Sequence, residues 1–405
     1  MSKNVLIVSY YFPPGGGVGS FRAAKFVKYL RGFDWTPYVV SLPPDRQSKF
    51  LSDDLDNDQY ASITEIPEET NHVDVTGIAA SKPLGGIRWL PSLSRALPKI
   101  IETHEIDVVL HTGSPFLPLL CSTWVRHRTD VPYILDLRDP WYVDKELFEN
   151  TKSVANPIWN WINKISEQKA LKYSDRVILN TPRMESLYNV QYPEFTHKFT
   201  TITNGFDPSD YDYTAADPFE GVRIVHPGRF RRKTEGLLKA LEQTTRREPA
   251  IELVHFGRLD YRHTERFYNE AERLGIRDKI DARGYTELES IVSTIKSADI
   301  GLVVSRPGDP THIPTKIYDY IACDIPVLAL DTPDGALTQI IEQFDHAYCA
   351  SHDDVQRIIE ILDVLIETQP QTLGSEEQRK KYTRHHLTGN LAQVLEESIE
   401  VSGRI

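Results

Sequence analysis

Short apolar segments alternate with longer helical patterns along most of this chain. The apolar segments are rich in Val, Ile and Leu with few polar interruptions, which is typical of parallel strands covered on both faces. The predicted strands span residues 4–9, 37–42, 106–111, 131–136 and 175–180, and then 222–226, 251–256, 299–305 and 325–330. Helical patterns at 18–31, 156–172, 234–246 and 354–367 separate them. This alternation predicts an α/β fold with parallel, doubly wound Rossmann-like sheets.

The length of 405 residues suits two such domains. Between the two groups of strands, residues 205–221 are rich in Asp, Pro and Gly without periodicity, so we predict a linker at 206–221. The predicted domains are residues 1–205 and 222–373. Residues 374–405 are polar and helical, and one option is that they pack back toward the first domain.

Charge and cysteine content limit the partners and the compartment. The formal net charge of -12 disfavours nucleic acid as a partner. The 3 cysteines are scattered, which fits a reducing cytoplasm, and the 13 histidines show no ligand spacing, so we predict no metal. The first residues lack a signal-peptide pattern, and no apolar run is long enough to span a bilayer. We expect a cytoplasmic protein, with the option of a peripheral position at the inner membrane face.

A glycine-rich segment, YYFPPGGGVGS at 10–20, directly follows the first strand and opens a helix. Gly15, Gly16, Gly17 and Gly19 would let the backbone approach a ligand, and the helix N-terminus beyond them offers free N–H groups. Ligands of α/β sheets bind at this carboxyl edge. The alternative is a flexible turn.

A basic cluster opens the second domain, in HPGRFRRKTEGLLKAL at 226–241. Its cations are Arg229, Arg231, Arg232 and Lys233, at a strand-to-helix turn of an otherwise acidic chain. We predict that Arg229 and Lys233 contact a diphosphate and that the other two face solvent. The alternative is that all four form a solvated face.

Two further strand ends carry candidate site residues. In SRPGDPTHIPTKIYDYIACDIPVLAL at 305–330, Asp319 suits a ribose and Lys316 lies one turn earlier; a surface ion pair is the alternative. In LDLRDPWYVD at 135–144, we expect Arg138, Asp139 and Trp141 on the acceptor side, the alternative being a helix cap with a buried salt bridge.

Two segments receive weaker interpretations. The D-x-D spacing in DDLDND at 53–58 lies in an acidic, irregular stretch, and we interpret it as solvated. The stretch at 82–99 carries Lys82, Arg88, Arg95 and Lys99 around Trp89 and several leucines. It suits peripheral contact with an anionic membrane, or else a helix that packs inward.

Taken together, these segments resemble family 4 of the retaining GT-B glycosyltransferases over nearly the whole chain. The likeness is carried by SYYFPPGGGVGSFRAAKFVKYL, DLRDPW, NGFD at 204–207, HPGRF with Lys233, and PTKIYDYIACDIPVLAL. The chain departs from the family pattern at Thr311 and Asp319, where the family often has two glutamates, and at Thr234, where it usually has glycine. A histidine common in the first domain's cleft is replaced in the Arg138–Asp139 region.

The resemblance implies two Rossmann-like domains facing across a cleft, and sugar transfer from a UDP- or GDP-linked donor to a hydroxyl of a glycan, lipid or small molecule. It implies retention of configuration, no metal and no cofactor beyond the nucleotide sugar as co-substrate. Asp139, Arg229 and Lys233 would be catalytic. The alternatives are a nucleotide-sugar 2-epimerase and an inactive nucleotide-sugar-binding protein.

Overall fold

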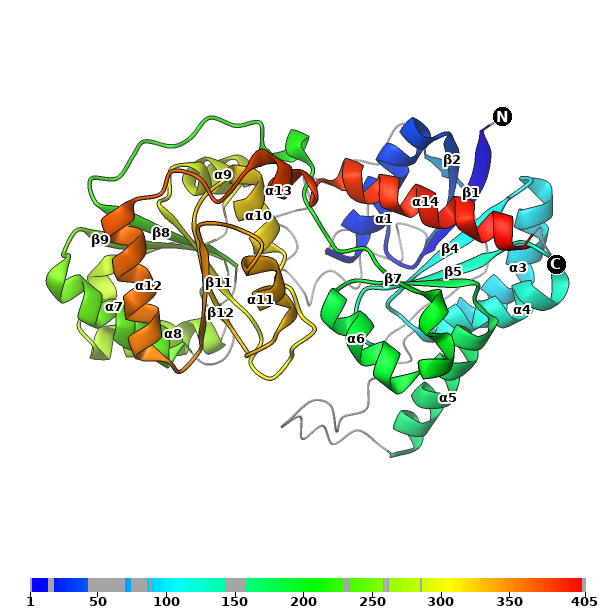
Figure 1. Ribbon diagram of the computed structural model, residues 1–405, viewed down its shortest axis with the longest axis horizontal. Helices are drawn as coiled ribbons and strands as arrows, with labels where there is room; N and C mark the ends of the chain where they lie inside the picture. Colours follow the sequence, from blue (N-terminus) through cyan, green and yellow to red (C-terminus); the bar gives the residue numbers. More distant parts are fainter. Residues whose placement is uncertain are drawn as a thin grey trace. The chain divides into compact units, whose positions relative to one another are not determined.

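The structure is a computed structural model of the chain. It describes residues 2–13, 18–42, 70–73, 86–87, 89–142, 157–228, 230, 234–257, 259, 262–284 and 286–402. The chain divides into two compact units: Met1–Asn204 with Arg384–Ile405, and Gly205–Thr383 (Figure 1). Each unit is built on its own parallel sheet.

The first unit contains a seven-stranded sheet in the order β3-β2-β1-β4-β5-β6-β7. Its strands are β1 (Lys3–Ser9), β2 (Trp35–Val40), β3 (Asn71–His72), β4 (Val108–Gly113), β5 (Tyr133–Leu137), β6 (Arg176–Leu179) and β7 (Phe199–Thr201). All neighbouring strands pair in parallel. The strand order reverses at β1, so the crevice outside β1 and β4 is the position where such sheets bind ligands.

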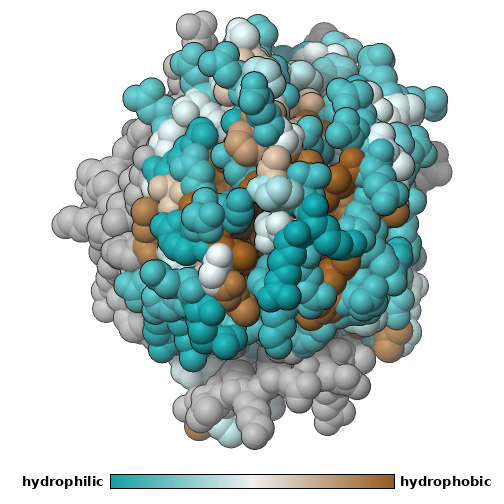
Figure 2. All heavy atoms as spheres, turned by 90° about the vertical axis from the view of Figure 1, so that its left-hand side faces the viewer, coloured by the Kyte–Doolittle hydropathy of each residue, from teal (hydrophilic) through white to brown (hydrophobic). Residues whose placement is uncertain are grey.

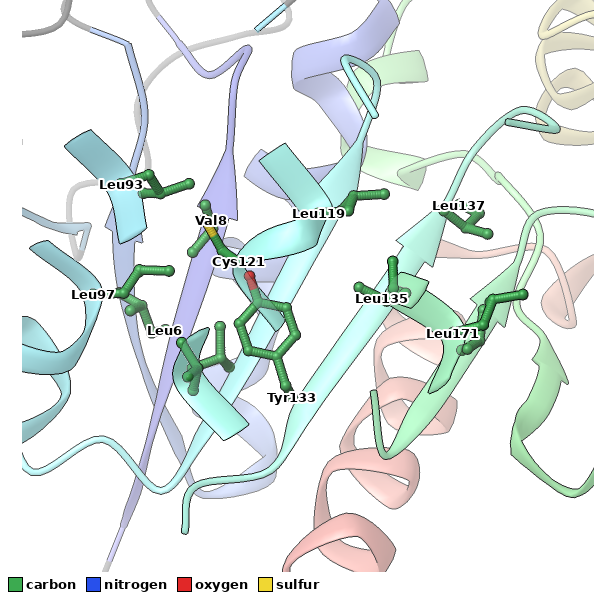
Figure 3. Close-up of a cluster of buried hydrophobic side chains, with 14 of the residues drawn as sticks. Leu6, Val8, Leu93, Leu97, Leu119, Cys121, Tyr133, Leu135, Leu137 and Leu171 are labelled. Carbon is green, nitrogen blue, oxygen red and sulfur yellow. The ribbon is translucent and has the colours of Figure 1, made fainter. Parts of the chain in front are cut away.

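Helices cover both faces of this sheet. One face packs against α1 (Val18–Leu30) and α14 (Arg384–Ser402). Val5 and Ile7 of β1 and Leu391 of α14 are buried in the same cluster. The other packs against α3 (Trp89–Thr103), α4 (Cys121–Arg128), α5 (Pro157–Tyr173) and α6 (Pro182–Gln191). Figure 3 shows Leu6 and Val8 of β1 on the same side of the sheet as Leu93 and Leu97 of α3. The 3-10 helices η1 (Arg31–Phe33), η3 (Leu117–Leu120) and η5 (Pro193–Lys198) connect these elements.

The second unit contains a six-stranded parallel sheet in the order β10-β9-β8-β11-β12-β13. Its strands are β8 (Val222–Pro227), β9 (Ile251–Phe256), β10 (Ile280–Gly284), β11 (Ile300–Val304), β12 (Val327–Asp331) and β13 (Ala347–Ser351). Helices α7 (Glu235–Arg247), α8 (Arg262–Arg273) and α12 (Val355–Thr368) pack on one face. Helices α9 (Leu288–Lys296), α10 (Lys316–Cys323) and α11 (Ala336–Ile341) pack on the other. The unit also contains η6 (Pro208–Tyr211), η7 (Arg277–Lys279) and α13 (Glu376–Lys380).

The predicted α/β fold with two doubly wound parallel sheets is confirmed. The nine predicted strands correspond to β1, β2, β4, β5, β6, β8, β9, β11 and β12. The sequence prediction missed β3, β7, β10 and β13. These strands lie at or beside sheet edges, and they are either two or three residues long or interrupted by polar residues, so they lack the continuous apolar pattern of a buried strand.

The predicted linker at 206–221 differs from what the structure shows. Phe206 lies in the core of the second unit, and Ala216 N–H donates to the carbonyl of Ser293 at 2.9 Å. The segment therefore belongs to the second unit, together with residues 374–383. The chain returns to the first unit only at α14, where His385 contacts the rings of Tyr29 and Phe33.

Helix α3 packs inward rather than toward solvent. Trp89 is 0% exposed, and Leu93 and Leu97 are buried beside it, so the interpretation of 82–99 as a membrane-facing stripe is wrong for its apolar residues. Arg95 and Lys99 are exposed, whereas Lys82 and Arg88 lie outside the described residues. Within the described part of the chain, no helix is both long and apolar enough to cross a membrane.

A buried ion pair joins three segments of the first unit. Arg22 of α1 donates to the Asp136 carboxylate of β5, at 3.0 Å from Nε to Oδ2 and 2.9 Å from Nη2 to Oδ1. Both side chains are 1% exposed. The same guanidinium donates to the carbonyls of Ile202 and Thr203 at 2.8 Å, just before the chain enters the second unit. The pair therefore fixes α1, β5 and the end of the first unit against one another.

Asp136→Asn should lower the free energy of unfolding of the first unit by about 3–5 kcal/mol, because it leaves the buried Arg22 charge without its partner. Urea denaturation followed by tryptophan fluorescence measures this unit alone, since all 6 tryptophans lie within Met1–Asn204. The matched control is Glu397→Ala, which breaks a partly exposed pair with Arg176 and should cost about 0–1 kcal/mol. Equal losses in the two variants would contradict a special role for Asp136.

Candidate active site

In the second unit, Lys316 lies beside the turn at which the chain leaves β8. The chain leaves β8 at Gly228 with φ of 101°, a conformation that strongly favours glycine. A Cβ at this position would lie 3.3 Å from Lys316 Nζ, so the glycine also lets the lysine cross the backbone. The first residue of α10 is thereby placed beside the turn that leads from β8 to α7.

Two buried histidines at the ends of neighbouring strands support this turn. His226 Nδ1 lies 2.9 Å from the carbonyl of Leu302, so this nitrogen carries the proton and Nε2 accepts from Lys316 Nζ at 3.4 Å. His255 Nε2 likewise donates to the carbonyl of Gly228 at 2.8 Å, which leaves Nδ1 to accept from a tyrosine hydroxyl of α8 at 2.5 Å.

The charge state of His255 follows from its surroundings. Its pKa is lowered to about 4, mainly by burial and also by the nearby Lys316 ammonium, while the hydrogen bond to the Gly228 carbonyl acts in the opposite direction. His255 is therefore neutral at neutral pH. It holds the turn by hydrogen bonding and adds no positive charge to the site.

Phe230 anchors the basic loop predicted to bind phosphate. Its ring is 0% exposed and stacks on Phe267 at 3.8 Å and on His226 at 4.2 Å between centroids. Thr234, at the other end of the loop, precedes α7 and makes no side-chain cap. The four cations themselves, Arg229, Arg231, Arg232 and Lys233, lie outside the described residues. The structure thus places the two ends of the loop at the carboxyl edge of β8.

Asp319 lies one turn into α10 and is buried, 6% exposed, so its interpretation as half of a surface ion pair does not hold. Its Oδ1 accepts a hydrogen bond from the hydroxyl of Tyr211 at 2.5 Å. Tyr211 ends η6, in the segment predicted to be a linker, and sequence reasoning did not single it out. A carboxylate held this way presents a fixed acceptor beside the Lys316 turn.

Thr311, where the family resemblance leads one to expect an acidic residue, is buried, 5% exposed. Its N–H and hydroxyl donate to Asp309 Oδ1 at 3.2 and 2.8 Å. The other oxygen of Asp309 lies 3.5 Å from Arg306 Nη1. A carboxylate is therefore present two residues before Thr311, held in the loop between β11 and α10.

In the first unit, Arg138 has a structural role. It donates from Nε to the carbonyl of Gly113 at 2.5 Å, and from Nη1 to that of Gly19 at 2.7 Å. Its Nη2 donates to the carbonyl of Ser114 at 3.2 Å, and burial lowers the pKa of the guanidinium. A Cβ at Gly19 would lie 2.8 Å from Nη1, so this glycine is needed for the contact.

This geometry corrects the expectation that Arg138 faces an acceptor, because its guanidinium donates to backbone carbonyls. The side chain of Trp141 also contacts other residues of the first unit. Its ring stacks on Phe116 at 5.6 Å between centroids, and Nε1 donates to Asn163. Asp139 is exposed and remains a candidate. The salt bridge weighed as an alternative for this segment exists, but between Asp136 and Arg22. Gly15, Gly16 and Gly17 lie outside the described residues.

A buried carboxylate supports the segment around Trp141. Glu167 of α5 is 0% exposed and accepts hydrogen bonds from the hydroxyls of Tyr188 and Tyr192 of α6, the second at 2.6 Å. It also accepts from the N–H of Tyr142 at 3.3 Å, next to Trp141. The pKa of Glu167 is raised to about 7, because the effect of burial exceeds that of these hydrogen bonds, which act in the opposite direction. Among the described residues, no group of histidine, cysteine and acidic side chains could hold a metal ion.

Comparison with protein families assigns both halves of the chain. Residues 22–210 match the family model described as Glycosyltransferase Family 4, and residues 220–386 match the model described as Glycosyl transferases group 1. The chain is a GT-B glycosyltransferase of the family 4 type. A search of curated proteins finds no match for this glycosyltransferase.

Solved structures share the fold of the glycosyltransferase at low sequence identity. Sucrose-phosphate synthase from Thermosynechococcus elongatus superposes with a TM-score of 0.71 at 15% identity, covering 98% of this chain and 100% of that one. HepE from Anabaena in complex with UDP gives 0.67 at 15% identity, covering 98% and 100%. A glycosyltransferase from Rickettsia africae also gives 0.67 at 15%, covering 98% and 99%. At this identity the likeness concerns the fold.

The pH dependence of stability should report on Glu167 of this glycosyltransferase. Its pKa is raised from an ordinary value of 4.5 to about 7, so between these values the folded state binds more protons than the unfolded chain. The stabilisation is complete below about pH 4.5 and is lost as the pH rises through about 7, at up to about 1.4 kcal/mol per pH unit. Glu167→Gln cannot titrate and should remove this loss.

Unfolding by urea, measured from about pH 5 to about pH 8 on both proteins, gives the difference directly. Other groups titrate over this range, but they contribute equally to the wild type and to the variant. The wild type should lose stability relative to Glu167→Gln as the pH rises. Parallel pH profiles would mean that Glu167 is already ionised in the folded protein at low pH.

Proposed function

We propose that this glycosyltransferase moves a sugar from a UDP- or GDP-linked donor to a hydroxyl of a glycan, lipid or small molecule, with retention and without a metal. The observation that carries the donor site is the meeting of Lys316, the Gly228 turn and the Asp319–Tyr211 pair at one edge of the second sheet. Cationic, backbone and carboxylate groups are what a sugar nucleotide requires in its diphosphate and ribose regions.

In this proposal the nucleoside lies along the first turn of α10. The Asp319 carboxylate accepts the ribose hydroxyls, and Tyr211 holds one carboxylate oxygen in place by donating to it at 2.5 Å. The carboxylate is buried and oriented before the ligand arrives, so little ordering is left to cost affinity. The HepE structures were solved with UDP and with UDP-glucose, which supports uracil as the first base to test here.

The diphosphate would lie between α10 and the loop after β8. Lys316, Arg229 and Lys233 supply positive charge, and the N-terminus of α7 supplies backbone N–H groups. As the bond from the sugar to the phosphate oxygen breaks, negative charge grows on the leaving diphosphate. The acceptor oxygen forms the new bond to the same carbon, and its proton passes to the leaving diphosphate oxygen. Fixed cations at the leaving group stabilise the transition state more than the bound donor, which is the work a metal would otherwise do.

The acceptor is proposed to bind to the first unit, near the glycine loop at Gly15–Gly19 and the exposed Asp139. The hydrogen bonds of Arg138 to the carbonyls of Gly19 and Gly113 hold the walls of that edge in place. The structural role of Arg138 is thus compatible with Asp139 contacting the acceptor directly.

Asp319→Ala should weaken binding of UDP by about 1–3 kcal/mol, the range for hydrogen bonds to a charged group. Tyr211→Phe keeps the carboxylate but removes its donor, so it should cost less, about 0.5–1.5 kcal/mol. Isothermal titration calorimetry with UDP, and with GDP in parallel, measures both. Glu289→Ala removes an exposed acid of the same unit and should leave affinity unchanged. Wild-type affinity in Asp319→Ala would remove Asp319 from the site.

The basic loop gives a second test, a comparison of four substitutions in the presence of excess EDTA. Arg229→Ala and Lys233→Ala should each lower kcat about 30- to 1000-fold, with a smaller change in the donor KM, because their contact strengthens as the leaving group gains charge. Arg231→Ala and Arg232→Ala are matched controls that should be near neutral. Four near-neutral variants would move the phosphate site to the Gly15–Gly19 loop. Wild-type activity lost in EDTA and restored by Mn²⁺ would contradict metal independence.

A further inference from the structure

Helix α5 turns an apolar stripe toward solvent. Ile158, Trp161 and Ile165 are 66%, 64% and 42% exposed, and their spacing of three and four residues places them on one face of the helix. The opposite face is already packed, since Glu167, Ala170 and Leu171 are buried against the first unit. The stripe residues are therefore separate from the apolar residues that pack the core of this unit.

Two more tryptophans are partly exposed on α5 and on the neighbouring helix. Trp159 of α5 is 38% exposed, and Trp124 of the neighbouring α4 is 40% exposed. The two helices lie side by side, with the rings of His127 and Tyr173 5.3 Å apart (Figure 1). We name these five residues, Trp124, Ile158, Trp159, Trp161 and Ile165, the α5 surface.

The exposed charged side chains on α4 and α5 are all basic, and the nearby acids Asp130 and Asp175 lie just beyond the ends of these helices, with Asp175 3.4 Å from Arg126 Nη1. Lys164, Lys169 and Lys172 of α5 are exposed, and so is Arg128 of α4. The two helices contain a single acidic residue, Glu167, which is buried. A basic, tryptophan-rich surface thus stands out on a chain with a formal net charge of -12.

We propose that the α5 surface docks the enzyme on a bilayer that contains anionic lipid. Tryptophan and isoleucine side chains would enter the interface, and the lysines would meet the head groups, as in helices that lie in the membrane plane. The face of the second unit that carries α7, α8 and α12 is mostly hydrophilic in Figure 2. The proposal is independent of which sugar is transferred, and its test uses no turnover.

The test is flotation of the full-length protein with two kinds of vesicle. One contains phosphatidylcholine alone, and the other contains equal amounts of phosphatidylcholine and phosphatidylglycerol. Wild-type protein should float with the anionic vesicles at low salt and much less at high salt. The double variant Lys169→Glu/Lys172→Glu should lose at least about 25-fold in binding, since each lysine near an anionic surface contributes about 5-fold. Trp161→Ser and Ile158→Ser, each made alone in the wild-type protein, should also lose most of the affinity for anionic vesicles.

Matched controls separate docking from general surface effects. Val190→Ser removes a 72% exposed apolar side chain from α6 of the same unit, and Lys239→Glu reverses an exposed charge in α7; both should bind like wild type. The circular dichroism melting curve of each variant should match the wild type, because the replaced side chains are exposed.

Wild-type protein that stays unbound with anionic vesicles, or serine variants that bind as tightly as wild type, would overturn the proposal. A concentration-dependent dimer that Trp161→Ser abolishes, without vesicle binding, would also overturn it and identify a second copy as the occupant. In either case the donor site would remain testable by UDP calorimetry.

Discussion

Coverage of both faces of each parallel sheet is the constraint on which the rest of this structure depends. Strands buried on two sides must be apolar along most of their length, so polar groups enter them mainly near the carboxyl ends. His226, His255 and Asp331 occupy such positions in the second unit, and Asp136 does so in the first. Each finds its partners within the fold, because a buried polar group left unpaired is costly.

These strand-end residues divide by what they hold. Asp136 binds Arg22, and Asp331 accepts from Ser305 at 2.5 Å and from Thr338, so both tie sheet to helix. His226 and His255 instead hold a turn that touches Lys316. The same edge therefore supplies both the rigid frame and the groups that we propose to contact the donor. A rigid frame matters because charge stabilisation of a leaving group requires donors that are already in place.

The central strands could be predicted because strands buried on both faces have continuous apolar sequences. The Asp319 position could also be singled out, from its place early in a helix after a buried strand. Tyr211, its hydrogen-bond donor, could not, because it lies 108 positions earlier in an irregular segment and meets Asp319 only through tertiary packing. The same reason explains Arg138, whose backbone partners come from two other segments.

Trp89 and α5 show how far exposed apolar surfaces can be predicted from the sequence. A stretch with lysines, arginines, leucines and a tryptophan at 82–99 suggested a membrane face, yet Trp89 is fully buried. The exposed tryptophans belong to α4 and α5, whose sequences also contain apolar residues that do pack inward. Sequence pattern reveals that a helix is amphipathic, but which apolar residues face the sheet depends on how the helix is rotated against it.

Hydrogen–deuterium exchange with and without UDP tests the central claim most directly, because it locates the nucleotide without assuming any residue. The account predicts slower exchange in the turn after β8, in the first turns of α10 and in Pro208–Tyr211, with no change in α3 or α5. UDP binding that protects only segments of the first unit, or none of the second-unit segments, would contradict a donor site at Lys316 and Asp319.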